Sequence, residues 1–426
     1  MPILTEVHLL RRRGLWRLLG VAACTSVCGC PGRPGPELTD SGTVVSGLEV
    51  RDIRALLSSG REPVRFHVNG AYSIRGDRAR VTHHRRPAGW TEVSNHDGLI
   101  VGGRPAGSRR AEIVPRPGVT FELSVLRNGT WSPARRYGGR LVLVARAEGE
   151  LLVINRVDLE TYVAGVLTRE LYPDWHREAY RAQAVAARTY AMVQMSRNAG
   201  RDYDLTCTEA AQVYGGLAEG RGARRAVEAV RYTRGIVATW TSPAGERIFC
   251  TYYSSACGGR SQSVADCKPE PEIPPLAGGV RCDYCRIAKG NVYRWGPVRF
   301  SKRDLNSRLL ARYPRLAETL GRISAVEVAR RTRSGRPGRI RLTGTNGQSD
   351  ELVAEDFRLA VGSRTMRSTD CRFQDTGSEI VLSNGRGFGH GIGLCQWGMQ
   401  GQALAGRKAA QILKFYYPGM HLTRAY

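Results

Sequence analysis

The sequence lacks several motifs that would each assign the protein to a function class. It has no His-Glu-x-x-His pair, which argues against a zinc hydrolase of the protease type. Its glycine-rich C-terminal segment lacks the Gly-Lys-Ser/Thr ending of a phosphate-binding loop. After the N-terminal leader, no apolar stretch is long enough to span a bilayer. There is also no internal repeat and no long low-complexity tract.

Acidic residues are scarce, with 38 Asp and Glu against 64 Lys and Arg, giving a formal net charge of +26. The basic residues run through the whole chain and form neither a concentrated stripe nor a known nucleic-acid-binding module, so we expect no nucleic-acid partner. The excess of positive charge then has two explanations. Either the protein surface is generally basic, or the charge attracts an anionic polymer or surface.

The N-terminus predicts export to the cell envelope. Arg11-Arg12-Arg13 and Arg17 precede a short apolar stretch that ends at Ala23, and residues 1–30 therefore look like a signal leader. Val21-Ala22-Ala23-Cys24 resembles a bacterial lipoprotein cleavage box, which would attach the protein to the membrane through a lipidated Cys24. A linker is expected over residues 31–60.

The remaining sequence predicts an α+β fold in two parts. Between residues 61 and 150, short apolar runs separated by glycine-bearing turns predict an antiparallel β-rich region. Residues 151–426 are expected to form a core in which a helical segment packs with antiparallel β regions. A cysteine-rich insertion is expected near residues 250–295.

Two helices open the predicted core, and a carboxylate lies between them. The first is expected over residues 159–170 with Asp158 as its N-cap, and the second over residues 175–198 with Asp174 as a candidate cap. Glu170 ends the first helix, where the negative end of the helix dipole and apolar neighbours would favour its protonated form. A carboxylic acid kept protonated near neutral pH can serve as a general acid. The alternative is an exposed glutamate at a helix end.

His390 lies in a segment that has five glycines between Gly385 and Gly393. Such a segment suits a place where the backbone passes close to a ligand or a neighbouring strand. The imidazole could act as a general base, a hydrogen-bond partner of a substrate or a metal ligand. The alternative is a histidine in an ordinary turn.

Four cysteines could form a closed, structural zinc site. Cys282 and Cys285 make a C-x-x-C knuckle, and Cys257 and Cys267 could complete the tetrahedron. Cys250 could replace Cys267. The alternative for an exported protein is a pair of disulfides.

Several segments together resemble the stage II sporulation protein D family, which includes peptidoglycan lytic transglycosylases and amidase enhancers. The resemblance covers about residues 140–420 and rests on segments that occur in the family's order: 157–166, Glu170, 179–191, Gln212-Val-Tyr-Gly-Gly216, Ser254-Ser-Ala-Cys-Gly-Gly259, Arg367-Ser-Thr369, Gly387-Phe-Gly-His-Gly-Ile-Gly393 and Tyr416-Tyr-Pro-Gly419.

The resemblance implies cleavage of peptidoglycan glycan strands, with Glu170 as the catalytic acid. It also implies substrate-binding roles, which we assign to Arg188, Gln183, Tyr190, His390 and Gln396. Family members that resemble zinc proteins use a histidine and cysteines near Ser254–Gly259. Here Tyr253 occupies the position expected for that histidine, which favours an all-cysteine ligand set with Cys282 and Cys285.

The implied reaction needs only one carboxylate. The C6 hydroxyl of muramic acid attacks its own anomeric carbon, so the nucleophile is part of the substrate. The alternative function is that of a non-catalytic cell-wall-binding protein that stimulates a partner N-acetylmuramoyl-L-alanine amidase.

Overall fold

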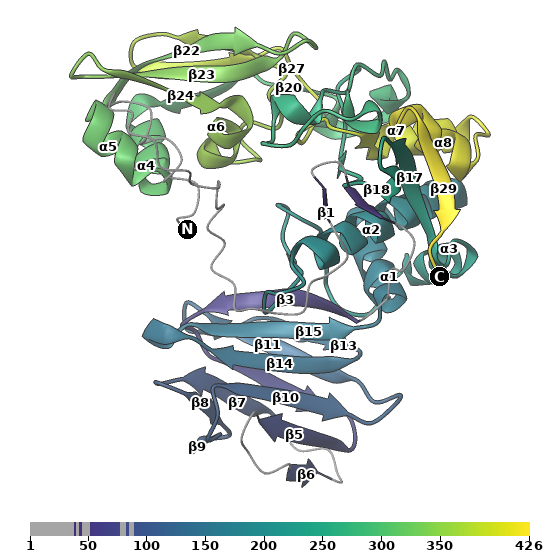
Figure 1. Cartoon of the computed structure of the whole chain (residues 1–426). Helices are drawn as coiled ribbons and strands as arrows, with labels where there is room; N and C mark the ends of the chain where they lie inside the picture. Colours follow the sequence, from purple (N-terminus) through teal and green to yellow (C-terminus); the bar gives the residue numbers. More distant parts are fainter. Residues whose placement is uncertain (1–37, 40–41, 45–51, 77–81, 85–88) are drawn as a thin grey trace, which may run out of the picture.

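The computed structural model describes residues 38–39, 42–44, 52–76, 82–84 and 89–426 (Figure 1). The predicted leader with Cys24 lies outside these residues. The predicted linker over residues 31–60 is wrong at its C-terminal end, because Ile53–Gly60 form a paired strand. Within the described part of the chain, no helix combines the length and apolar character needed to cross a membrane.

Two largely antiparallel sheets form the lower lobe in Figure 1. The first contains, in spatial order, β16 (Leu205–Thr206), β3 (Ile53–Gly60), β15 (Leu151–Val157), β14 (Arg140–Ala145), β10 (Arg110–Pro115), β5 (Tyr72–Gly76) and β6 (Thr82–His84). The second contains β12 (Thr130–Trp131), β11 (Phe121–Arg127), β4 (Val64–Val68), β7 (Thr91–Asn95), β8 (Leu99–Val101) and β9 (Arg104–Pro105), with β13 (Arg135–Tyr137) also paired with β11.

Strands β14 and β15 are apolar on both faces because both faces are covered. Leu141 and Leu143 belong to one core with Phe66 and Phe121 of the second sheet. On the opposite face, a small separate cluster is formed by Leu56, Val142, Leu152 and Ile154. Strands buried on both sides have nearly continuous apolar sequences. The pairing of β14 with β15 also means that one sheet crosses the predicted boundary at residue 150.

Three helices lie on top of this lobe, namely α1 (Leu159–Glu170), α2 (Arg177–Arg197) and α3 (Ala223–Tyr232). Helix α2 is buried along most of its length because many of its residues are alanines, which let neighbouring elements approach closely. Asp158 caps α1 as predicted, since its carboxylate accepts a hydrogen bond from the Thr161 N–H at 2.9 Å. The cap of α2 is His176 instead of Asp174, and its Nδ1 accepts from the Glu178 N–H at 3.2 Å.

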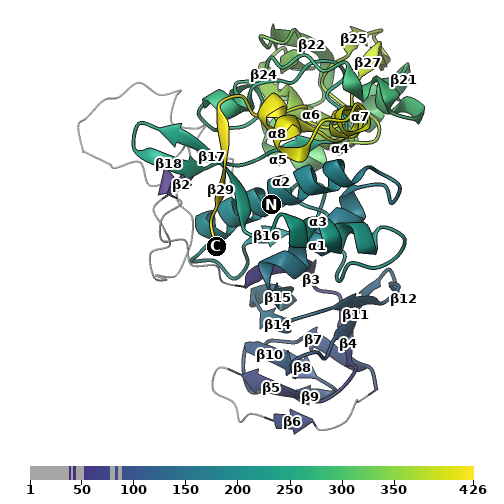
Figure 2. The same cartoon turned by 90° about the vertical axis from the view of Figure 1, so that its right-hand side faces the viewer.

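The C-terminal elements cover the other side of α2 (Figure 2). Strand β29 (Met420–Arg424) lies antiparallel to β17 (Ile236–Ser242), whose other neighbour is β18 (Gly245–Ile248). Beyond β18 this sheet continues into β2 (Gly42–Val44) and β1 (Leu38–Thr39). Helices α7 (Gln396–Leu404) and α8 (Ala409–Tyr416) pack on α2, while β28 (Leu394–Cys395) pairs with β19 (Tyr253–Ser254).

A second unit with its own apolar core occupies the upper left of Figure 1. Its core residues include Leu305, Leu320, Ile340 and Phe357. Its elements are β20 (Arg294–Trp295), β21 (Val298–Ser301), α4 (Lys302–Arg312), α5 (Pro314–Leu320), β22 (Ile323–Arg331), β23 (Pro337–Gly344), β24 (Ser349–Val353), α6 (Ala354–Val361), β25 (Arg372–Asp375), β26 (Glu379–Ser383) and β27 (Gly385–Arg386). The sequence had predicted a single core over residues 151–426, and this unit is separate from the main core.

Helices and several antiparallel sheets therefore make up the described structure, and the predicted α+β class is confirmed. Short 3-10 turns connect the elements around the cysteine-rich segment, at Val264–Asp266, Pro274–Leu276, Tyr284–Ile287 and Gly290–Val292.

Candidate functional site

Glu170 is placed by the end of α1. The buried face of this helix, which includes Tyr162, Val166 and Leu167, anchors it in the core. Leu171 ends the helix in an extended conformation, and its N–H donates to the Leu167 carbonyl at 3.1 Å. The Glu170 carboxylate is thereby held at the corner between α1 and α2.

The Glu170 carboxyl group is half-buried and accepts two hydrogen bonds. The Val213 N–H donates to one oxygen at 3.0 Å, and the Gln396 side-chain amide donates to the other at 3.1 Å. Burial raises the pKa of Glu170 above its ordinary value, and the negative charge of Glu209 acts in the same direction. The two hydrogen bonds oppose this shift because they favour the ionised form.

Tyr253 connects the Glu170 region with the segment around His390. Burial raises the pKa of Tyr253, and the nearby charge of Glu170 adds to this shift. The Tyr253 hydroxyl accepts a hydrogen bond from the Gln212 amide at 3.1 Å, and Gln212 is adjacent to Val213 in the chain. The motif from Gln212 to Gly216 carried part of the family resemblance, but the sequence alone indicated no role for these residues.

His390 is held as a neutral imidazole. Its Nδ1 accepts the Ile392 N–H at 3.0 Å, and its ring lies edge-on to Tyr252 with a centroid distance of 5.9 Å. Burial lowers the pKa of His390 to about 3, with further lowering by the positive charges of Lys268, Arg358 and Arg336. The ring is therefore uncharged at neutral pH. Because Nδ1 accepts the Ile392 N–H, the proton of the neutral ring is on Nε2, which donates a hydrogen bond and cannot accept one.

The glycines around His390 allow close packing against the protein's own backbone. A Cβ at Gly387 would lie 2.6 Å from the Ala256 carbonyl oxygen, and one at Gly389 would lie 2.7 Å from the Ser254 Cβ. Both glycines have positive φ angles. Of the two explanations that the sequence left open, the structure supports a neighbouring chain segment as the reason for these glycines.

Two predicted substrate-binding residues lie in the interior, which corrects those predictions. Arg188 is fully buried, with 0% of its surface exposed, and forms a bidentate ion pair with Glu160 at 2.6 and 3.0 Å. Gln183 is also fully buried on α2. Neither side chain can touch a polymer at the surface of this structure. Alanines and polar residues are buried all around α2, because other elements cover this helix on most sides.

Tyr190 is buried as well, but Gln396 contacts the candidate acid. The Tyr190 ring packs edge-on against Tyr252 and Tyr253, at centroid distances of 5.9 and 6.4 Å. Gln396 donates to the Glu170 carboxylate, as described above. The structure therefore brings Glu170 and Gln396 together and places Tyr190 behind them.

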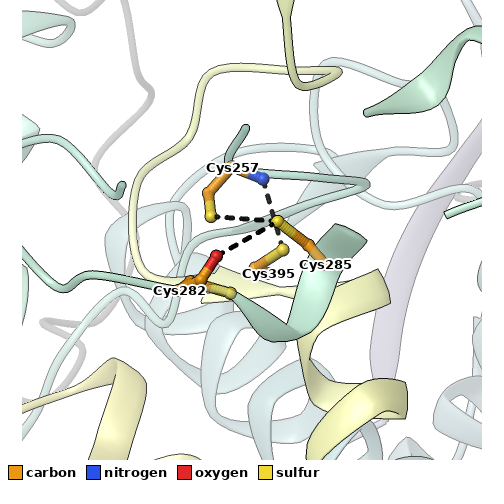
Figure 3. Close-up of side chains that lie close together, drawn as sticks. All are labelled: Cys257, Cys282, Cys285 and Cys395. Atoms are coloured by element: carbon orange, nitrogen blue, oxygen red, sulfur yellow. Dashed lines mark hydrogen bonds between the residues drawn. The ribbon is translucent and has the colours of Figure 1, made fainter. Parts of the chain in front are cut away.

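Four buried cysteines converge next to this region (Figure 3). They are Cys257, Cys282, Cys285 and Cys395, and their sulfur atoms all lie within 4.8 Å of one another. The Cys257 and Cys285 sulfurs are 3.8 Å apart. A tetrahedral zinc ion with Zn–S bonds of about 2.3 Å would separate its sulfur ligands by roughly 3.8 Å. The cluster therefore has the donor type and the dimensions of a metal-binding site.

The predicted fourth ligand, Cys267, was wrong. Cys267 lies outside the cluster and accepts a hydrogen bond from the Gln262 amide at 2.8 Å, and the suggested substitute Cys250 lies beside Gln194 instead. Cys395 takes the fourth position because β28 pairs with β19, which brings the C-terminal segment to Cys257. This ligand is 110 residues from Cys285 in the sequence, so spacing alone could not identify it.

The surroundings of the cluster favour a thiolate at Cys282, whereas neighbouring thiols and burial raise the pKa of Cys257 and Cys395. The N–H groups of Cys257 and Gly398 donate to the Cys395 sulfur at 3.2 and 3.3 Å, and the Tyr416 hydroxyl lies 3.0 Å from the Cys282 sulfur. Hydrogen bonds from the neighbouring thiols and from Tyr416 lower the pKa of Cys282. Among the cysteines that the structure describes, all are free thiols, so the alternative pair of disulfides is not formed there.

One protein-family model matches the part of the chain that contains Glu170. Residues 147–240, which span β15, α1, α2 and α3, match the family model SpoIID, described as stage II sporulation protein. This match, together with the named relatives below, supports a relationship of the chain to the stage II sporulation protein D family. An uncharacterized protein of Brachyspira hyodysenteriae is 28% identical over 374 residues, which cover 87% of this chain and 92% of that protein.

Two relatives from Bacillus have descriptive names. The chain is similar to the stage II sporulation protein D of Bacillus amyloliquefaciens, with 25% identity over 64% of this chain and 76% of the relative. It is also similar to the amidase enhancer of Bacillus subtilis, with 25% identity over 61% of this chain and 40% of the relative. The chain therefore spans less than half the length of the amidase enhancer.

Proposed function

We propose that this protein cleaves peptidoglycan glycan strands by lytic transglycosylation, with Glu170 as both general acid and general base. The observation that carries the proposal is the Glu170 carboxyl group, whose pKa burial raises and which Val213 and Gln396 hold in one orientation. The family match over residues 147–240 includes this carboxylate and supports a function at the cell wall.

In the proposed reaction, protonated Glu170 donates its proton to the glycosidic oxygen as the bond from that oxygen to the anomeric carbon of muramic acid breaks. The C6 hydroxyl of the same muramic acid then forms a bond with the anomeric carbon. The Glu170 carboxylate accepts the proton of this hydroxyl, which restores the acid. The products are a shortened glycan and a 1,6-anhydro-muramic end. Hydrolases with two carboxylates need the second one to activate water or to act as nucleophile, whereas here the substrate supplies the nucleophile.

We also propose that the four-cysteine cluster holds a structural zinc ion. Cys257, Cys282, Cys285 and Cys395 fill all four tetrahedral positions, so no open position remains for a substrate. When bound, such an ion cross-links chain segments and supplies no catalytic chemistry. The cluster joins the 3-10 turn Tyr284–Ile287 to the start of α7, where Gln396 contacts Glu170.

The decisive experiment compares wild-type protein with the Glu170→Gln variant on purified glycan strands. Chromatography and mass spectrometry would measure release of 1,6-anhydro-muropeptides. We expect wild-type activity and a loss of at least about 100-fold in the variant, since a positioned acid-base group contributes roughly 10²–10⁴-fold. Glu209→Gln is a matched control, because this exposed carboxylate influences Glu170 only through its charge. Equal product from wild type and Glu170→Gln would refute the proposal.

A second function is stimulation of a cell-wall amidase without catalysis. The similarity to a protein named amidase enhancer favours it, and a location in the cell envelope suits both functions. Amidase activity would be measured with and without the purified protein. Stimulation that persists in Glu170→Gln, together with glycan binding but no anhydro product from wild type, would favour this second function over the first.

A further inference from the structure

Tyr172 is an exposed aromatic ring two residues after Glu170. More than half of its surface, 55%, is exposed, although its two aromatic neighbours are buried. Its ring lies 5.4 Å from the Trp175 ring and 5.4 Å from the Trp397 ring, measured between centroids, and these two indoles are 5.1 Å apart. The three rings form one cluster, of which Tyr172 is the face open to solvent. We call this cluster the aromatic platform.

The backbone that carries Tyr172 is fixed by contacts from other elements. The Tyr180 hydroxyl of α2 donates to the Tyr172 carbonyl at 3.1 Å. The Arg225 guanidinium of α3 donates to the carbonyls of Pro173 and Trp175, at 2.9 and 2.8 Å. A ring that is held in place before a ligand arrives loses little conformational freedom on binding. The exposed position of Tyr172 is therefore built into the corner between α1 and α2.

The first two residues of α7 connect the platform with the candidate acid. Gln396 donates to the Glu170 carboxylate at 3.1 Å, and its neighbour Trp397 contacts the Tyr172 ring. The carboxylate and the open ring thus contact two consecutive residues of one helix start. Glu170 and Tyr172 are also only two residues apart in the chain, so a polymer bound at the carboxylate would lie near the platform.

From this arrangement we infer that Tyr172 is a sugar-binding platform for a pyranose ring of the glycan strand, next to the bond that Glu170 would cleave. One face of a pyranose carries mainly C–H groups, which pack against the electron-rich face of an aromatic ring. The Tyr172 ring offers such a face, since more than half of its surface is exposed while Trp175 and Trp397 support it from behind. The inference rests on the proposed function, because it takes glycan as the polymer at Glu170.

Binding to purified glycan strands without stem peptides tests the inference. The Glu170→Gln variant serves as the parent, so that no cleavage occurs, and both calorimetry and tryptophan fluorescence follow the titration. We expect Tyr172→Ala to weaken binding about tenfold or more. Tyr172→Phe keeps the ring and should bind like the parent. Because Trp175 and Trp397 flank the ring, glycan should also change their emission, and Tyr172→Ala should reduce that change.

Tyr232→Ala is the matched control. Tyr232 is another exposed tyrosine, 64% exposed, but it lies on α3 with its ring against the Arg181 guanidinium. This variant should bind glycan like the parent. All variants change solvent-exposed rings, so equal melting temperatures are expected and would show that each variant is folded.

The outcomes separate this inference from the proposed function. If wild type cleaves glycan and Tyr172→Ala binds like its parent, the platform is refuted while the proposed function stands. If Tyr232→Ala weakens binding as much as Tyr172→Ala, a specific platform beside Glu170 is refuted as well. If neither wild type nor the parent variant acts on or binds glycan, the proposed function fails and the inference falls with it.

Discussion

Replacing Arg188 with methionine should destabilise the fold and should leave glycan binding by the folded protein unchanged. The Arg188 guanidinium is fully buried and bonded to Glu160 through two of its nitrogens. Removal of one partner from a buried ion pair costs about 3–5 kcal/mol, because the other charge stays behind in the interior. Here the Glu160 carboxylate keeps hydrogen bonds from the Gly235 N–H at 3.2 Å and the Tyr426 hydroxyl at 2.5 Å. The loss should therefore be near the lower limit, about 3 kcal/mol.

Thermal melting measures this loss. One kcal/mol shifts the melting temperature by roughly 2–4 °C in a cooperative unit of roughly 150–250 residues, so Arg188→Met should melt about 6–12 °C lower than wild type. Arg224→Met is the matched control, since Arg224 pairs with Glu228 on the surface at 3.1 Å with 89% of its side chain exposed. Exposed pairs contribute about 1 kcal/mol at most, and little change is expected.

The double variant Glu160→Gln/Arg188→Met tests the reasoning further. Removing both charges leaves no unpaired ion in the core, so this protein should be more stable than Glu160→Gln alone. The result that would refute the reasoning is an Arg188→Met protein that melts like wild type but no longer binds glycan. That result would place Arg188 at the glycan surface, as the sequence had suggested.

Two further predictions concern Glu170 and the cysteine cluster. Burial raises the pKa of Glu170 in the folded state. The unfolded chain therefore loses the Glu170 proton at a lower pH than the folded protein does. As a result, the stability of the folded protein falls as the pH rises from about 4.5 through the folded pKa. Glu170→Gln lacks this effect, and its gain in melting temperature over wild type should grow between pH 4 and pH 7; a constant difference would contradict the shift. Metal analysis by mass spectrometry should find zinc in the purified protein, and Cys395→Ser should lose it. Cys267→Ser should retain zinc, and the reverse pattern would restore the ligand set expected from the sequence.

Local features were predicted well where the sequence determines them locally. Helix α1 begins and ends where its apolar spacing and its Asp158 cap predicted, and Glu170 lies at its end. The sequence pattern was misleading at the start of α2. Asp174 looked like the N-cap, but the chain turns after Pro173 and the helix begins only after His176, which is its N-cap. Polar residues inside a helix were also ambiguous, since Arg188 and Gln183 could face a groove or the core. Arg188 faces the interior, where Glu160 and the Ile236 carbonyl accept its hydrogen bonds, and both partners lie far from it in the sequence.

Long-range partners could not be predicted because they depend on topology. Cys395 reaches Cys257 through the pairing of β28 with β19, and no spacing rule relates these two residues. The unit from Arg294 to Arg386 was missed for a related reason. Its strands and helices resemble those of the surrounding chain in composition, and only the packing separates its core from the main core.

The position of Cys395 explains why a metal site would be needed beside this candidate active site. Helix α7 contains Gly398 and Gly401, and each glycine in a helix costs roughly 1 kcal/mol relative to alanine. Neither position can carry a side chain, because a Cβ at Gly398 would lie 2.6 Å from the Cys282 sulfur and one at Gly401 would meet the Tyr284 carbonyl oxygen. The helix is therefore weak by itself and depends on its anchors.

Cys395 is the anchor at the start of α7, where its sulfur accepts the Gly398 N–H at 3.3 Å as a helix cap. The next two residues are Gln396, which holds the Glu170 carboxylate, and Trp397, which holds the Tyr172 ring. A metal ion bound by four thiolates would fix the start of α7 at Cys395, and the side chains of Gln396 and Trp397 contact the candidate acid and the aromatic platform. A closed structural site can in this way be essential for catalysis without contacting the substrate.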